Sequence, residues 1–107
     1  MTAVRLEVAA TELQRRQGLM YRRSLPRDSG MLLVFDAPAA HPIWMRNVRM
    51  PLDLVFLDSN QVVLEVARGE PGSADSIAVP DTRFVVELAA GVARELGVVP
   101  GSRWAWT

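Results

Sequence analysis

Apolar residues in this chain gather in short runs, each five or six residues long and bounded by turn residues. Such runs are too short for the helices of a globular core, but they match the usual length of a buried strand. They occupy residues 31–35, 52–57, 62–67 and 84–89. Residues 4–8 alternate between apolar and charged side chains, which is typical of a strand with one exposed face. The pattern predicts a mainly β protein.

Two segments favour short helices. Thr11 followed by Gln14 is a capping-box pattern, and it predicts a helix that continues to about Met20. Residues 91–96 have room for about one and a half helical turns before Gly97. Many short strands with one or two short helices predict a compact antiparallel sandwich or barrel, jelly-roll-like in shape.

Turn residues mark the connections between these elements. Residues 58–61 read Asp-Ser-Asn-Gln and predict a hairpin. Residues 36–42 contain two prolines and are expected to form a surface loop, and residues 69–81 a longer one. After Gly101 we expect a last strand in which Trp104 and Trp106 share a face.

Length and charge bound the function. A chain of 107 residues suits one domain, which we expect to span residues 1–107. Its twelve basic residues, all arginine, balance twelve acidic ones, so we expect neither nucleic acid nor an anionic membrane as a partner. The absence of cysteine excludes disulfides and thiolate chemistry. Because the first twenty residues are charged, we expect no signal peptide among them, and no apolar run is long enough for us to expect membrane insertion.

Several motifs recur in a familiar order. They are Gly-Leu-Met-Tyr-Arg at 18–22, Gly-Met-Leu at 30–32, Trp-Met-Arg-Asn at 44–47, Pro-Leu-Asp at 51–53 and Val-Glu-Leu at 86–88. In this the chain resembles domain-of-unknown-function family 192, an uncharacterised bacterial and archaeal family. The resemblance implies a compact, mostly β, jelly-roll-like domain and no established reaction. Because family members are often exported behind a signal peptide, it is also compatible with an exported or periplasmic native form.

The segment 44–47 together with Asp53 is the strongest candidate binding site. In an extended chain Trp44 and Arg46 face one way, while Met45 and Asn47 face the other. An indole beside a guanidinium and an amide supplies both a stacking surface and directed hydrogen bonds, as polar small molecules and saccharides require. The alternative is structural, with Trp44 and Met45 in the core, Arg46 paired with Asp53 and Asn47 in a turn.

Two further residues complete the candidate site, Arg22 and Glu87, both as secondary contacts. Glu87 and Glu65 each interrupt an otherwise apolar strand, so at least one is expected to be partly buried. If the two strands are neighbours, the carboxylates approach each other, and the pair would suit a glycosidase-like hydrolase. We rank this enzyme below simple binding, because structural ion pairs involve the same residues.

Two other interpretations remain open. Four internal methionines and His41 are ligand types that suit Cu(I), but their spacing forms no tight cluster, so we expect neither a metal nor a cofactor. Trp104 and Trp106 either cover the edge of the core or form a flat self-association patch, which would indicate a structural or protein-interaction domain. The sequence therefore predicts non-enzymatic binding of a polar small molecule, with a saccharide as one such ligand, and leaves the oligomeric state open.

Overall fold

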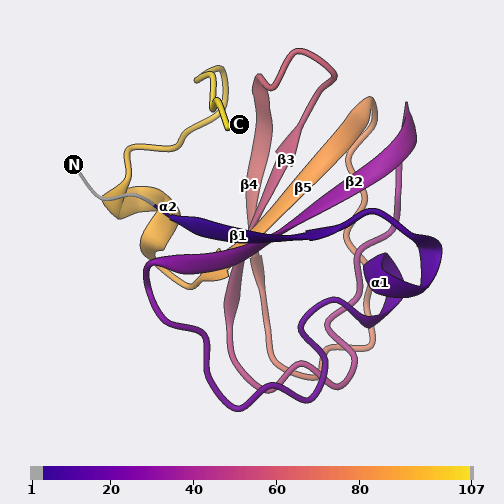
Figure 1. Cartoon of the computed structure of the whole chain (residues 1–107), viewed down its shortest axis with the longest axis vertical. Helices are drawn as coiled ribbons and strands as arrows, with labels where there is room; N and C mark the ends of the chain where they lie inside the picture. Colours follow the sequence, from indigo (N-terminus) through magenta and orange to yellow (C-terminus); the bar gives the residue numbers. More distant parts are fainter. Residues whose placement is uncertain (1–3, 107) are drawn as a thin grey trace.

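One open sheet organises the chain. The computed structural model describes residues 4–106. The five strands are β1 (Arg5–Ala9), β2 (Ser29–Ala39), β3 (Leu52–Leu57), β4 (Val63–Gly69) and β5 (Thr82–Ala89). Their order across the sheet is β1-β2-β5-β3-β4, with β1 and β2 parallel and the other neighbouring pairs antiparallel. Figure 1 shows the strands fanning out from β4 to β1, which crosses in front of the others. The sheet is therefore mixed and strongly twisted.

Two short helices accompany the sheet, as the sequence predicts. Helix α1 (Glu12–Gln17) begins with the expected capping box, in which the Thr11 hydroxyl accepts from the Gln14 amide at 3.1 Å. It ends three residues before the predicted Met20, because Gly18 leaves helical geometry with φ +48° and ψ −126°. Helix α2 (Val92–Glu95) is a single turn. A mainly β chain with two short helices is thus confirmed.

The hairpin between β3 and β4 is also confirmed. The Asp58 carboxylate closes the turn by accepting from the amides of Asn60 and Val62, at 2.8 and 3.0 Å. Two other boundaries differ from expectation. β2 continues to Ala39, through part of the predicted loop 36–42, because Ala39 still pairs with Thr82 beyond an irregularity in the ladder. The predicted last strand after Gly101 is reduced to a single bridge between Val62 and Arg103.

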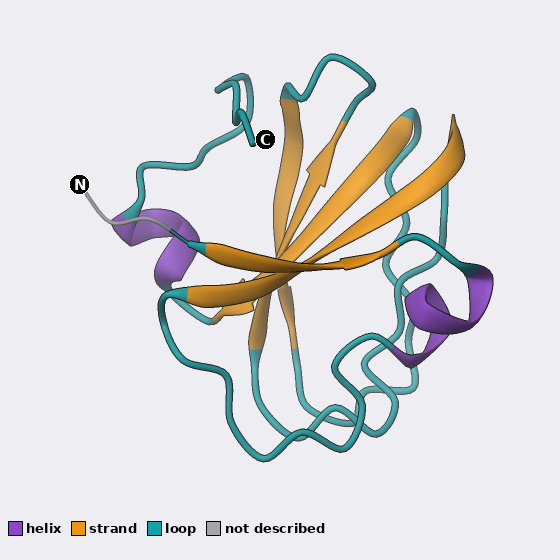
Figure 2. Cartoon of the chain, viewed as in Figure 1, coloured by secondary structure: helices purple, strands orange, loops and turns teal. Residues whose placement is uncertain are grey.

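The predicted sandwich or barrel is not what residues 4–106 form. There is one sheet, and both of its faces are apolar, so each face is covered by other parts of the chain. All six residues of β3 are buried, because other parts of the chain cover the strand on both faces. Long loops cover one face and α2 with the C-terminal segment covers the other, so no second sheet is needed (Figure 2).

Two core clusters result, one on each face. The loop-side core contains strand residues together with buried residues of the loops, namely Leu19, Ile43, Met45 and Val48. The α2-side core contains the alternate strand residues with Val92 and Ala93 of α2, and Trp104 and Trp106 pack against it. In the described part of the chain, no helix has the length and apolar character needed to cross a membrane.

Candidate functional site

Three loops meet at one end of the sheet, below the strands in Figure 2. The loop of residues 40–51 lies between the other two and is hydrogen-bonded to both. It joins the loop of residues 70–81 through a bridge between Ile43 and Ile77 and through the Gly72 amide, which donates to the Met45 carbonyl at 3.2 Å. It joins the loop after α1 through the Tyr21 amide, which donates to the Asn47 carbonyl at 2.8 Å. These bonds hold the three loops as one unit.

The middle loop presents the predicted pair Trp44 and Arg46 on the surface. Met45 between them is buried, since its sulfur fills the space where Gly69 has no side chain. Trp44 is 41% exposed, and the guanidinium of Arg46 lies over its ring at 4.4 Å from the centroid. A cation over an indole face is attracted by the ring electrons, so the two side chains fix each other's position.

Asn47 departs from the expected alternation. The sequence places it on the side of Met45, but Asn47 is exposed while Met45 is buried. The chain turns here, with the Val48 amide donating to the Met45 carbonyl at 3.1 Å and Asn47 at φ +60°. Asparagine tolerates this left-handed conformation better than most residues. The turn leaves Asn47 exposed, as Trp44 and Arg46 are.

Tyr21 is a second exposed aromatic residue, on the neighbouring loop, and it was not singled out from the sequence. It is 62% exposed and has φ +65°, an uncommon conformation for a bulky residue and one that costs about 1–2 kcal/mol. The hydrogen bond from the Tyr21 amide to the Asn47 carbonyl holds the backbone in this conformation. No local signal in the sequence marks it, because the helix end that favours Gly or Asn is occupied by Gly18, three residues earlier. We call Tyr21, Trp44, Arg46 and Asn47 the loop-end surface.

Glu87 lies beneath the loop that carries Tyr21. It sits in the middle of the sheet, paired with Met31 on one side and Leu54 on the other, and is 4% exposed. Burial raises its pKa to about 7, since desolvation penalises the charged carboxylate. Among the described residues, its Oε1 has no hydrogen-bond partner. A Cβ on Gly18 would come within 3.4 Å of that oxygen, so the turn after α1 closes directly over the carboxyl group.

Arg22 follows Tyr21 and points to the sheet edge. Its guanidinium pairs with the Glu7 carboxylate of β1. Glu7 is in register with Met31, and Met31 is in register with Glu87, so the two glutamates lie in one row across the sheet, with β2 between them. Arg22 therefore lies beside the loop-end surface and is already engaged by a carboxylate.

Comparison with known proteins agrees with the motifs. The family model DUF192, described as Uncharacterized ACR, matches residues 1–106. This chain belongs to the DUF192 family. It is similar to a crystal structure from Sinorhizobium meliloti 1021 described as "a putative transcription regulator", with 38% identity, a TM-score of 0.88, and coverage of 92% of this chain and 78% of that one. It is also similar to a protein of unknown function from Novosphingobium aromaticivorans DSM 12444, with 33% identity, a TM-score of 0.86, and coverage of 96% and 75%. A search of curated proteins gives no match.

Asp53 of this DUF192 domain lies away from the loop-end surface. It alternates with Leu52 and Leu54 of the loop-side core, so its side chain points to the face covered by α2. There its Oδ2 accepts from the amides of Gly91 and Ala93, at 2.9 and 3.0 Å. These donors belong to the start of α2, whose first amides lack partners within the helix. The structure thus gives Asp53 a capping role, and it does not pair with Arg46 in the way the structural alternative supposed.

Glu65 and Glu87 of the DUF192 domain are not neighbours. β3 separates their strands, and Glu65 is paired with Phe56, two positions away from the row of Glu87. Two strand spacings and a two-residue offset separate their Cα atoms by roughly 12 Å. Glu65 is also exposed on β4, whereas Glu87 is buried. The expected approach of the two carboxylates does not occur.

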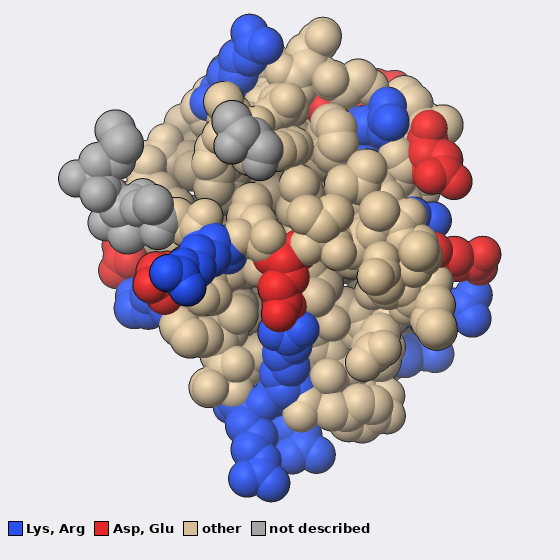
Figure 3. All heavy atoms as spheres, viewed as in Figure 1, with Lys and Arg blue, Asp and Glu red and all other residues tan. Residues whose placement is uncertain are grey.

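The arginines clustered at residues 15–27 of the DUF192 domain are mostly engaged. Arg16, Arg22 and Arg27 pair with Glu12, Glu7 and Glu95. Arg15 donates to the carbonyls of Ala10 and Val34. Figure 3 shows blue and red side chains in direct contact near the middle and at the left of this face. Three of the five arginines in this basic run are therefore paired with carboxylates in the fold.

Proposed function

We propose that this protein binds a polar small molecule with a ring, a saccharide in particular, at the loop-end surface, and that it does so without catalysing a reaction. The proposal is carried by one observation: two large aromatic side chains, Tyr21 and Trp44, are exposed on loops whose backbones are hydrogen-bonded to each other. Exposed aromatic rings offer flat apolar area, and the C–H face of a sugar ring packs against such area.

Polar groups of the right kind stand beside these rings. Arg46 and Asn47 are exposed, and between them they offer several donors and one amide acceptor. Arg46 already lies over Trp44, so little side-chain freedom is lost when a ligand arrives. Arg22 lies one residue beyond Tyr21 and pairs with Glu7, so only its remaining N–H donors would serve as a peripheral contact. This mixture of apolar area and directed hydrogen bonds is what orients a small polar ligand.

The backbone of Tyr21 adds independent support. A bulky residue is retained in a left-handed conformation only when the surrounding structure imposes it, and such residues gather at ligand clamps and active sites. Here the contact that imposes the conformation is the backbone hydrogen bond from Tyr21 to Asn47. Asn47 also has a left-handed backbone conformation. The strained backbone conformation presents the Tyr21 ring to solvent on the loop next to the middle loop.

A carboxylate-based hydrolase receives less support. Glycoside hydrolysis needs two carboxyl groups within about 5–9 Å across a substrate. Glu65 and Glu87 lie on strands separated by β3, and Glu87 is covered by the turn at Gly18. The buried carboxyl group of Glu87 is better explained as a structural group of the sheet beneath the turn at Gly18.

A nucleic-acid role also receives less support, although the similar protein from Sinorhizobium meliloti is described as a putative transcription regulator. Proteins that bind nucleic acid neutralise phosphates with a basic surface. This chain has no net charge, and three arginines of its basic run pair with carboxylates.

Isothermal titration with glucose, N-acetylglucosamine, glucuronate and cellobiose tests the proposal. We expect saturable heat with at least one of these sugars, at least a tenfold loss of affinity in Trp44→Ala and Tyr21→Ala, and unchanged affinity in Leu13→Ala. Leu13 is 72% exposed on α1 and serves as the matched control. Absence of binding to all four sugars contradicts the ligand class. If Trp44→Ala and Tyr21→Ala bind the sugar as tightly as Leu13→Ala does, the binding site does not lie at the loop-end surface.

A further inference from the structure

The two edges of the sheet differ in how they are covered. β4 forms one edge, and the C-terminal segment runs along it: the Val63 amide donates to the Ser102 carbonyl at 2.8 Å, and the Gly101 amide donates to the Val63 carbonyl at 2.7 Å. β1 forms the other edge, and among residues 4–106 its strand partner is β2 alone. Figure 1 shows no described segment drawn in front of β1. Within residues 4–106, the β1 edge is therefore open.

At alternate residues of this edge, the backbone groups form no hydrogen bond with any other part of residues 4–106. The Arg5 amide donates to Asp28 at the start of the β1–β2 ladder, so the backbone groups of Arg5 and Glu7 face β2. In a strand the next residue along faces the opposite way, so the amides and carbonyls of Val4, Leu6 and Val8 point outward. An exposed edge of this kind is a template for pairing with another strand.

We propose that the partner is a second copy of this chain, paired antiparallel through β1 about a two-fold axis at Leu6. This register sets Leu6 against Leu6 of the second copy and Val4 against Val8, each pair using the outward-facing backbone groups. It also sets Arg5 of each copy directly against Glu7 of the other copy, which gives two such pairs. Opposite charges across neighbouring strands are favourable, and like charges in that position are unfavourable.

The charge pattern selects this register over its neighbours. A two-fold axis at Arg5 would set two arginines against each other, and an axis at Glu7 would set two glutamates together. An axis at Leu6 avoids both. Glu7 would then lie between Arg22 of its own chain and Arg5 of the second copy, since Arg22 already pairs with it.

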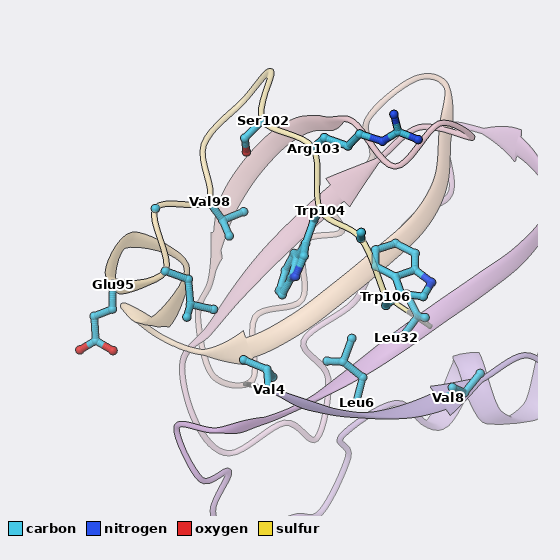
Figure 4. Close-up of a pocket in the computed structure, with 13 residues that line it drawn as sticks. Val4, Leu6, Val8, Leu32, Glu95, Val98, Ser102, Arg103, Trp104 and Trp106 are labelled. Atoms are coloured by element: carbon cyan, nitrogen blue, oxygen red, sulfur yellow. The ribbon is translucent and has the colours of Figure 1, made fainter. Parts of the chain in front are cut away.

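The apolar side of β1 fits the same arrangement. Val4, Leu6 and Val8 point from β1 toward Trp104 and Trp106 and line a groove of about 770 Å³ (Figure 4). Val8 is 58% exposed, a large value for an apolar strand residue in an open groove. Pairing sets Val4 of the second copy beside Val8 and brings the two grooves together across the new strand pair. The two five-stranded sheets then become continuous, as closed two-fold dimers allow.

Charge reversal with mixing tests the proposal by sedimentation velocity. We expect the wild type to have twice the monomer mass, and both Arg5→Glu and Glu7→Arg to be monomers, because each faces like charges across the axis. An equimolar mixture of the two variants restores complementary pairs, so we expect its mass to double again. Arg49→Glu and Glu65→Arg carry the same charge changes on the loop and on β4, and we expect them to remain dimers.

Val8→Pro provides a second variant, because proline removes an outward-facing amide and leaves the bonds to β2 in place. We expect it to be a folded monomer by near-ultraviolet circular dichroism. A monomeric wild type overturns the proposal. Dimers in both single charge variants, no recovery on mixing, or dissociation of the Arg49 and Glu65 controls also overturn it.

Discussion

Arg46 lies over the indole of Trp44, with its guanidinium carbon 4.4 Å from the ring centroid. The pair is exposed, so its contribution to folding is small, about 0.5–1 kcal/mol. Its role in the proposed site is to hold the indole in place. We expect Arg46→Ala to change the free energy of unfolding by less than about 1 kcal/mol and to lower saccharide affinity several-fold.

Urea unfolding and calorimetric titration measure these two effects, and Arg49→Ala is the matched control, since Arg49 is an exposed arginine of the same loop. A large loss of stability in Arg46→Ala would instead mean that the pair belongs to the core. An equal loss of affinity in Arg49→Ala would show that only charge matters.

We expect Tyr21 to lower the free energy of unfolding and to contribute to saccharide affinity. Its left-handed conformation is unfavourable for tyrosine and tolerated by asparagine. We therefore expect Tyr21→Asn to raise the free energy of unfolding by up to about 1 kcal/mol and to abolish saccharide binding. Thermal unfolding with titration of the same sample checks both. A destabilised Tyr21→Asn would refute the conformational strain described at this position.

Asp53 is expected to act on stability alone. Its Oδ2 accepts from Gly91 and Ala93 at the start of α2, on the face opposite the loop-end surface. Removing such a cap leaves two amides without partners, so Asp53→Ala should lose about 1–2 kcal/mol of stability. Asp53→Asn keeps an acceptor oxygen and should lose less. Both variants should retain wild-type saccharide affinity, and a loss of binding in a folded Asp53→Asn would place this residue in the site after all.

Glu87 is expected to make stability depend on pH between its unfolded pKa of 4.5 and its folded pKa of about 7. Its pKa in the folded protein is raised from 4.5 to about 7 by burial, so the folded state binds this proton more tightly than the unfolded state. The contribution is complete below the unfolded pKa and is lost as pH rises through about 7. At about 1.4 kcal/mol per pH unit, the loss amounts to about 3 kcal/mol above neutrality.

Urea unfolding at a series of pH values compares the wild type with Glu87→Gln and Glu65→Gln. Glutamine cannot ionise, so we expect the decrease in stability through pH 7 to vanish in Glu87→Gln. It should persist in Glu65→Gln, which alters an exposed carboxylate on β4. A pH profile that is the same in all three proteins would contradict the assignment of the raised pKa to Glu87.

Local chemistry explains what the sequence could predict of the fold. The capping box at Thr11 and the turn closed by Asp58 depend on residues within four positions of each other, and both were anticipated. The single sheet was not, because a strand buried on both faces has the same apolar pattern whether loops or a second sheet cover it. The parallel pairing of β1 with β2 depends on contacts distant in sequence, which periodicity does not encode.

For the candidate site too, local spacing was predictable from the sequence, and contacts between distant residues were not. Trp44 and Arg46 are two residues apart, and the sequence predicted that they lie on one side of the chain; they do, although Arg46 lies in a turn and not in an extended segment. The conformation of Tyr21 depends on a bond to Asn47, 26 positions away, and no local pattern signals it. Asp53 was misplaced because its partners, Gly91 and Ala93, reach it only after β3 and α2 have packed together.

Residue-level mapping of a bound sugar tests the loop-end surface most directly. In a ¹H–¹⁵N correlation spectrum the three indole groups are resolved by comparison with Trp44→Phe, and the sugar of highest affinity from the calorimetric series is added stepwise. We predict that the Trp44 indole and the amides of Tyr21 and Asn47 shift in a saturable manner, while the indoles of Trp104 and Trp106 stay in place. Shifts confined to Trp104 and Trp106, or none at the loop-end surface, would contradict the proposed binding site.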